Sequence, residues 1–140
     1  MESPAVRRRT MQAVKSKDTS VEMCVRQSLH AQGYRYRLHQ KNLPGSPDIV
    51  FGSRRKVIFI HGCFWHGHQC PRGRRVPKTN TDYWTAKIAR NSMRDVAALK
   101  KLYELGWKAS VVWECELTKN TAFVIKGLAR FLGPTAKASP

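Results

Sequence analysis

Acidic side chains are scarce in this sequence, so each one is informative. The chain has 9 Asp and Glu against 26 Lys and Arg in 140 residues, a formal net charge of +17. Self-repulsion at this level favours a partner that offsets it, and a polyanion is the obvious one. The basic residues are spread along the chain, which indicates a folded surface that follows the phosphates of a nucleic acid. A generally basic soluble protein, such as a ribosomal component, is the alternative.

Long apolar runs are also missing. No stretch approaches the roughly 20 residues that span a bilayer, and residues 1–12, MESPAVRRRTMQ, lack the apolar core of a signal peptide. We therefore expect a cytoplasmic protein without a membrane partner. The chain has four cysteines, and cytoplasmic thiols stay reduced. These cysteines therefore favour metal binding over disulfides.

Hydrophobic spacing and turn residues predict one domain over residues 18–133, between a mobile basic segment (1–17) and a disordered tail (134–140). The predicted helices, from apolar residues at helical spacing, are 19–33, 82–105 and about 120–132. The predicted strands are 49–51, 56–62 and 108–117. This order predicts an α/β fold with a mixed central sheet flanked by helices, whose last two strands are parallel.

The segment HGCFWHGHQC, residues 61–70, holds three of the five histidines and two of the four cysteines. Cys63, His68 and Cys70 have a spacing with which one loop can wrap a single ion, and zinc takes four such ligands in a tetrahedron. Cys115, on the last predicted strand, is the candidate fourth ligand. Four protein ligands would leave no open position, so the zinc would be structural. The alternative is a loop that binds nothing and a core thiol at Cys115.

Two histidines of the same segment remain, His61 and His66. A neutral imidazole can take a proton from water near neutral pH. Beside a rigid metal loop in a basic protein, this favours phosphodiester hydrolysis. Such hydrolysis needs a cation at the scissile phosphate, and magnesium prefers hard oxygen ligands. Asp48, which opens a predicted strand, is the best candidate for that ligand.

Two other acidic residues each have two interpretations. Glu22 lies three residues after Thr19, the spacing of a helix capping box, so a cap and an active-site role both stay open. Asp95 lies on the apolar stripe of the long predicted helix, where a carboxylate has to be paired. It either forms a salt bridge with Lys or Arg or orients one of the histidines, and we favour the second.

Four segments together resemble one known family. LPGSPDIVF (43–51), VIFIHGCFWHGHQC (57–70), YWTAKIARNSMRD (83–95) and LGWKASVVWECEL (105–117) are similar to very short patch repair (Vsr) endonucleases. The resemblance implies a variant of the PD-(D/E)xK nuclease fold. It also implies magnesium-dependent nicking of double-stranded DNA beside T:G mismatches that arise when 5-methylcytosine is deaminated. A bacterial, nucleoid-associated monomer is implied, with other repair proteins as candidate partners.

The resemblance also implies roles for single residues. Asp48 matches the aspartate that binds magnesium, Ile60 stands where a main-chain carbonyl binds the same ion, and His66 matches the proposed general base. Other active-site positions of the family are matched by His61, Asp95 and Glu22. The family's structural zinc ligands are matched by Cys63, His68, Cys70 and Cys115.

The chain departs from the general nuclease pattern on the second strand. The usual glutamate and lysine are absent, and Phe59, Ile60 and His61 stand there instead. Ile60 also replaces a threonine of the best-known family member. A main-chain ligand survives that change, because any residue supplies one, whereas a contribution from the hydroxyl group would be lost.

Aromatic residues on a basic surface can stack on bases or open a base step, and a mismatched pair costs less to unstack. Phe64 and Trp65 lie between predicted zinc ligands, and Trp84 lies near the start of the long helix. The resemblance implies that these three enter the mismatch from the major groove, and that Met11 enters from the opposite groove. The alternative is that Trp65 and Trp84 are core residues. For Trp113, which lies on a predicted strand, a core position is favoured.

Two other functions stay open. One is a nuclease of the same fold without mismatch selectivity. The other is a zinc-stabilised DNA-binding module without catalysis. Nicking of mismatched against matched duplex separates the first from a mismatch enzyme, and loss of nicking on removal of Asp48 excludes the second.

Overall fold

A computed structural model of the chain describes residues 19–63, 66–74 and 78–135. Within them, four strands form one mixed sheet in the order β1-β2-β3-β4. The first two pairs are antiparallel, and β3 and β4 are parallel. The predicted mixed sheet flanked by helices is thus confirmed. The strands are Arg37–Leu38 (β1), Ile49–Phe51 (β2), Lys56–His61 (β3) and Lys108–Trp113 (β4).

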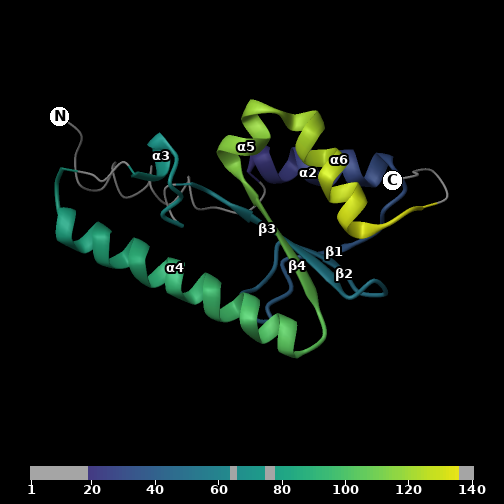
Figure 1. Cartoon of the computed structure of the whole chain (residues 1–140), viewed down its shortest axis with the longest axis horizontal. Helices are drawn as coiled ribbons and strands as arrows, with labels where there is room; N and C mark the ends of the chain where they lie inside the picture. Colours follow the sequence, from purple (N-terminus) through teal and green to yellow (C-terminus); the bar gives the residue numbers. More distant parts are fainter. Residues whose placement is uncertain (1–18, 64–65, 75–77, 136–140) are drawn as a thin grey trace.

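Helices cover both faces of this sheet. α2, α5 and α6 lie on one face, and the long α4 runs along the other (Figure 1). In the described part of the chain, no helix is long and apolar enough to cross a membrane. The segment predicted to be mobile (1–17) and most of the predicted tail lie outside the described residues. The helices are Ser20–Ala31 (α2), Pro71–Arg74 (α3), Thr81–Glu104 (α4), Glu114–Lys119 (α5) and Thr121–Leu132 (α6).

Helix α2 begins and ends where its sequence signals predict. The Thr19 hydroxyl accepts a hydrogen bond from the main-chain N–H of Glu22 at 3.3 Å, which satisfies one of the free donors of the first turn. Val25 and Leu29, four residues apart on one face, are fully buried. Gly33 follows the helix at φ +98°, a conformation that glycine adopts without a steric penalty.

Strand β3 is buried on both faces, as its continuous apolar sequence predicts. Ile58 packs in the core under α2 and α6. Val57 and Phe59 pack on the other face, against Leu102 of α4. The chain then crosses from β3 through α4 to β4, which is the connection that a parallel neighbour requires.

One predicted element is wrong. Residues 108–117 do not form a single strand, because β4 ends at Trp113 and α5 begins at Glu114. Two acidic residues lie in the first turn of α5, where their negative charges interact favourably with the helix dipole and stabilise the helix. Cys115 therefore comes from a helix, and it does not share a strand face with Trp113. Two short elements, β1 and α3, have no counterpart among the predicted ones.

Candidate active site and metal cluster

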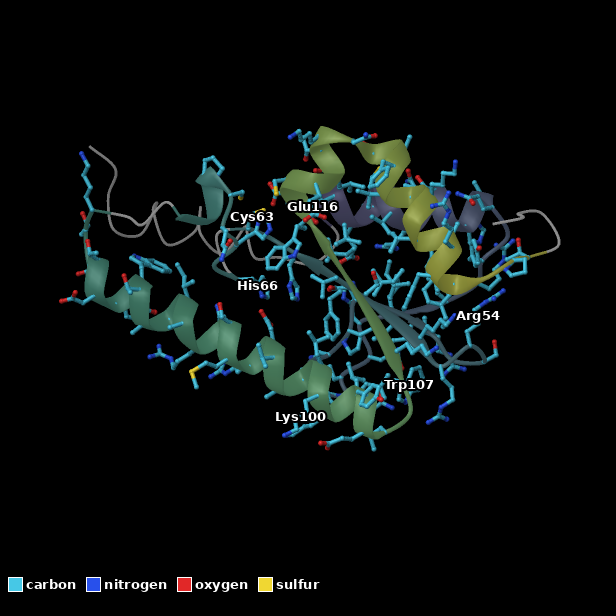
Figure 2. All side chains as sticks on the ribbon, in the orientation of Figure 1. Arg54, Cys63, His66, Lys100, Trp107 and Glu116 are labelled. Atoms are coloured by element: carbon cyan, nitrogen blue, oxygen red, sulfur yellow. The ribbon has the colours of Figure 1, made fainter. Side chains whose placement is uncertain are left out.

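Polar residues gather at one end of the sheet. Asp48 precedes β2, and His61 and Trp113 are the last residues of β3 and β4. The antiparallel pairing of β2 with β3 and the parallel pairing of β3 with β4 bring these three positions together. In Figure 2, His66 lies between α4 and the sheet, away from Arg54 on the right of the view.

Asp48 belongs to a group of mixed donors on the α2 side of this end. Its Oδ2 accepts a hydrogen bond from the main-chain N–H of Ile60 at 2.7 Å. Donor atoms of Glu22, His39 and Asp48 all lie within 4.8 Å of one another. Burial raises the pKa of the Asp48 carboxyl group, and the bond from Ile60 opposes this effect. A half-buried carboxylate of this kind is stabilised by a nearby cation.

Glu22 fulfils parts of both interpretations. Its main-chain N–H is capped by Thr19, but its side chain points into the protein and is 3% exposed. One carboxylate oxygen, Oε2, lies 3.2 Å from a guanidinium nitrogen of Arg26 and 3.1 Å from Nε2 of His39. The carboxylate is therefore part of the Asp48 group, and the cap is made by Thr19.

A second group, on the α4 side, joins two histidines to Asp95. Nδ1 of His66 lies 2.5 Å from Oδ2 of Asp95, and Nε2 of His61 lies 4.0 Å from Oδ1. The rings of His61 and His66 are stacked, with centroids 3.8 Å apart and an interplanar angle of 3°. An ionised carboxylate only accepts hydrogen bonds, so the proton of His66 lies on Nδ1 and Nε2 is left as an acceptor. The structure thus places Asp95 against two histidines. This agrees with the interpretation that Asp95 orients a histidine.

His61 is held in its neutral form. It is 6% exposed, and burial lowers its pKa to about 4, with a further decrease from His66 and an opposing effect from Asp95. Among the described residues, its buried Nδ1 has no hydrogen-bond partner. A neutral ring at physiological pH can stack on His66 without charge repulsion.

The two groups are connected through β3. Ile60, which binds Asp48, and His61, which stacks on His66, are consecutive residues of β3. His66 also lies within electrostatic reach of Asp48 and lowers its pKa. Asp48 and His66 thus lie within electrostatic range of one another.

Sequence reasoning missed two residues of this site. His39 lies between Glu22 and Asp48. It was missed because no sequence motif surrounds it. Trp113, for which the sequence favours a core position, meets His61 edge-on, with ring centroids 5.0 Å apart. Trp113 ends a strand that was predicted to be parallel to β3, and this position alone could have indicated that it lies beside His61.

The predicted zinc ligands are brought together beside this site. Donor atoms of Cys63, His68, Cys70 and Cys115 all lie within 4.8 Å of one another, and all four cysteines of the chain are free thiols. A hydrogen bond from His68 lowers the pKa of Cys70 to about 6, whereas burial raises that of Cys63 to about 12. Three sulfurs and one imidazole nitrogen are the donors that zinc prefers.

His68 is held from both sides. Its ring stacks on Trp113, with centroids 4.2 Å apart. Its Nδ1 lies 3.4 Å from Sγ of Cys115, and its Nε2 lies 4.0 Å from a carboxylate oxygen of Glu116. A carboxylate near the second nitrogen is a common way to orient a metal-binding histidine.

The loop between these ligands is also fixed against α4. The Ser92 hydroxyl donates a hydrogen bond to the main-chain oxygen of His66 at 2.9 Å. Gly67 has a φ of +64°, and a Cβ atom there would lie 2.9 Å from Cγ2 of Ile88. The absence of a side chain at Gly67 therefore lets the loop approach the helix.

Of the residues predicted to contact DNA, the structure describes Trp84. It is half-buried in the first turn of α4 and meets Tyr83 edge-on, with ring centroids 5.1 Å apart. The Lys87 ammonium group lies 5.8 Å from the centroid of its ring. The other three predicted residues, Met11, Phe64 and Trp65, lie outside the described residues.

Comparisons with known proteins give matches to one endonuclease family model and to named nicking enzymes and endonucleases. A family model described as DNA mismatch endonuclease Vsr matches residues 1–72. The type II nicking enzyme V.XorIIP of Xanthomonas oryzae is 55% identical over 116 residues, which cover 83% of this chain and 85% of the relative. The nicking enzyme V.NmeAIP of Neisseria meningitidis is 47% identical over 87% and 86% of the two chains. DNA mismatch endonuclease Vsr of Escherichia coli is 43% identical over 81% and 72%.

Proposed function

Because this chain belongs to the Vsr family of DNA mismatch endonucleases, we propose that it nicks one strand of duplex DNA beside a T:G mismatch by magnesium-dependent hydrolysis. One observation carries the chemistry. The Asp48 carboxylate and the His66–Asp95 pair lie at the same end of the sheet. A cation ligand and a proton acceptor are the two groups that phosphodiester hydrolysis requires.

The donors around Asp48 fit a hard divalent cation. Oδ2 of Asp48 accepts the Ile60 N–H, so Oδ1 and the main-chain oxygen of Ile60 would hold magnesium. Burial raises the pKa of Asp48, which means that its negative charge lacks full compensation without a cation. A dication bound there would supply positive charge beside the scissile phosphate. Isoleucine in place of threonine is compatible with this, because the oxygen belongs to the main chain.

His66 is the proposed general base. With its Nδ1 proton directed at Asp95, its Nε2 lone pair can accept a proton from the attacking water. Asp95 then stabilises the imidazolium that forms, because the charge-assisted hydrogen bond strengthens as His66 becomes positive. The stacked, neutral His61 keeps the plane of the His66 ring fixed.

Glu22, on α2, belongs to the same donor group as Asp48. Its carboxylate is within 4.8 Å of the Asp48 donor atom, and it raises the pKa of Asp48. We assign it to the active site as a second negative charge, which increases the affinity of the site for a cation.

The four soft ligands fit structural zinc. The donor atoms of Cys63, His68, Cys70 and Cys115 lie within 4.8 Å of one another, and together they would complete the tetrahedral set of a structural zinc, which leaves no position for substrate. Zinc would connect the loop after β3 to helix α5. Since that loop carries His66, a zinc ion bound there would hold the proposed general base in place.

Recognition of the mismatch is assigned to the basic surface and the aromatic residues. The net charge of +17 favours phosphate contacts on both strands. Trp84, together with Phe64, Trp65 and Met11, would enter the weakened T:G step, which costs less to open than a paired step.

The proposal is tested with duplexes that differ only in one base pair. We expect nicking of the T:G duplex in magnesium, no nicking in excess chelator, and much slower nicking of the matched duplex. Equal rates on both duplexes would instead identify a nuclease without mismatch selectivity.

A second experiment separates an enzyme from a DNA-binding module. Asp48→Ala should abolish nicking while the affinity for T:G DNA persists, because the change removes a metal ligand and adds no negative charge. Asp82→Ala, in the exposed first turn of α4, is the matched control and should nick normally. Full cleavage by Asp48→Ala in magnesium would exclude the assigned site.

A further inference from the structure

His39 has a main-chain conformation that is rare for a residue with a side chain. Its φ is +50°, in the left-handed region, which is unfavourable except for glycine and, to a lesser degree, for Asn, Asp and His. Its N–H donates a hydrogen bond to the main-chain oxygen of Asp48 at 3.0 Å. The residue thus closes the β1–β2 ladder directly opposite the proposed metal ligand, and such strained positions cluster at functional sites.

The left-handed turn changes the direction of the side chain. In β1, Leu38 packs toward the α2 face of the sheet, so a regular strand would direct residue 39 to the other face. The His39 ring instead lies against Glu22, which belongs to α2. The strained backbone therefore places the ring on the side where the two carboxylates are.

The ring lies between those carboxylates. Nε2 of His39 is 3.1 Å from Oε2 of Glu22, and Nδ1 is 3.8 Å from Oδ1 of Asp48, with the side chain 18% exposed. Oδ1 is the Asp48 oxygen that the Ile60 N–H leaves open. Each ring nitrogen therefore faces one of the two acidic groups, and the ring sets the distance between them.

We infer that His39 is a positioning residue for the cation site: its ring determines where the Glu22 and Asp48 carboxylates lie. This inference rests on the proposed function. Side chains that orient metal ligands typically change metal affinity or activity about 10- to 100-fold when they are removed. A ring that acts in this way affects the metal requirement first, and the rate at saturating metal less.

The test uses His39→Gly, because glycine accepts the left-handed backbone and removes only the ring. We expect the magnesium concentration for half-maximal nicking to rise about 10- to 100-fold, with a smaller change in kcat at saturating magnesium. Calorimetric titration of magnesium into the protein without DNA should show the same loss. Added imidazole should partly restore nicking in His39→Gly and leave the wild type unchanged.

Ser46→Gly is the matched control. Ser46 is exposed and also left-handed, with φ of +49°, in the same connection between β1 and β2. This variant relieves backbone strain without removing a ring near the site, so its magnesium dependence should equal that of the wild type. If His39→Gly fails to fold, His39→Asn, whose amide also tolerates the left-handed region, is measured in the same way.

The outcomes are distinguishable. Equal magnesium affinity and equal magnesium dependence in His39→Gly and Ser46→Gly would overturn the inference and leave the proposed function intact. A wild-type protein that does not nick T:G DNA in magnesium would refute the proposed function itself, whatever the behaviour of His39.

Discussion

Replacement of Asp95 by asparagine tests the proposed general base most directly. Oδ2 of Asp95 lies 2.5 Å from Nδ1 of His66, and both side chains are mostly buried. Asparagine removes the negative charge with almost no change in shape. It therefore removes the stabilisation of the imidazolium that forms when His66 takes a proton, and it leaves the packing of α4 unchanged.

The size of the effect follows from this one contact. A hydrogen bond to a charged group contributes about 1.5–3 kcal/mol, which corresponds to about a 10- to 150-fold loss of rate. If the introduced amide donates to His66 and reverses its tautomer, the loss extends toward the whole contribution of a general base, about 100- to 10,000-fold. The affinity for DNA should not change, because Asp95 faces His66 and His61.

The assay is single-turnover nicking of a T:G duplex at saturating enzyme and magnesium, with DNA affinity measured separately. Asp82→Asn, on the same helix and exposed, controls for loss of one negative charge and should nick at the wild-type rate. If Asp95→Asn nicks as fast as Asp82→Asn while the two bind DNA equally, His66 does not depend on Asp95 and the assignment of the base is wrong.

Two further predictions concern zinc and pH. Cys70→Ser should lose bound zinc and unfold at a much lower temperature, because structural zinc contributes about 10–16 kcal/mol in small zinc domains. Cys24→Ser, outside the cluster, should keep its zinc in elemental analysis, and equal stability of the two variants would refute structural zinc. The pKa of His61 is about 4 in the folded protein against its ordinary 6.5, so folding stability is lost as pH falls from 6.5 to 4, by about 3 kcal/mol. The free energy of unfolding is measured with denaturant at pH 7 and at pH 4. His61→Gln cannot take up a proton at this position, so its free energy of unfolding should fall less between the two pH values than that of the wild type. An equal fall would contradict the buried neutral ring.

The elements that sequence predicted well are those whose signal is local. Thr19 and Gly33 mark the ends of α2, and the apolar run of β3 requires burial on both faces. The end of β4 could not be predicted in the same way. Apolar alternation continues through Trp113 to Cys115, but the chain turns into α5 at Glu114, where Cys115 meets Cys63, His68 and Cys70 from an earlier part of the chain.

The site followed a similar rule. The scarcity of acidic residues made Asp48 and Asp95 stand out, and the structure places both half-buried carboxylates against histidines or main-chain donors. His39 gave no such signal, since its importance depends on a left-handed φ and on the pairing of β1 with β2. Neither property can be recognised from the types of the neighbouring residues.

The position of Cys115 has a consequence for protein synthesis. The other three residues of the cluster, Cys63, His68 and Cys70, leave the ribosome before Cys115 does. Helix α4 and strand β4 are synthesised in between. In a nascent chain, the Cys and His cluster therefore stays incomplete until α5 has emerged. The contacts of the His66 segment with α4 can form earlier, so the link to α5 is the last of its described contacts to be completed.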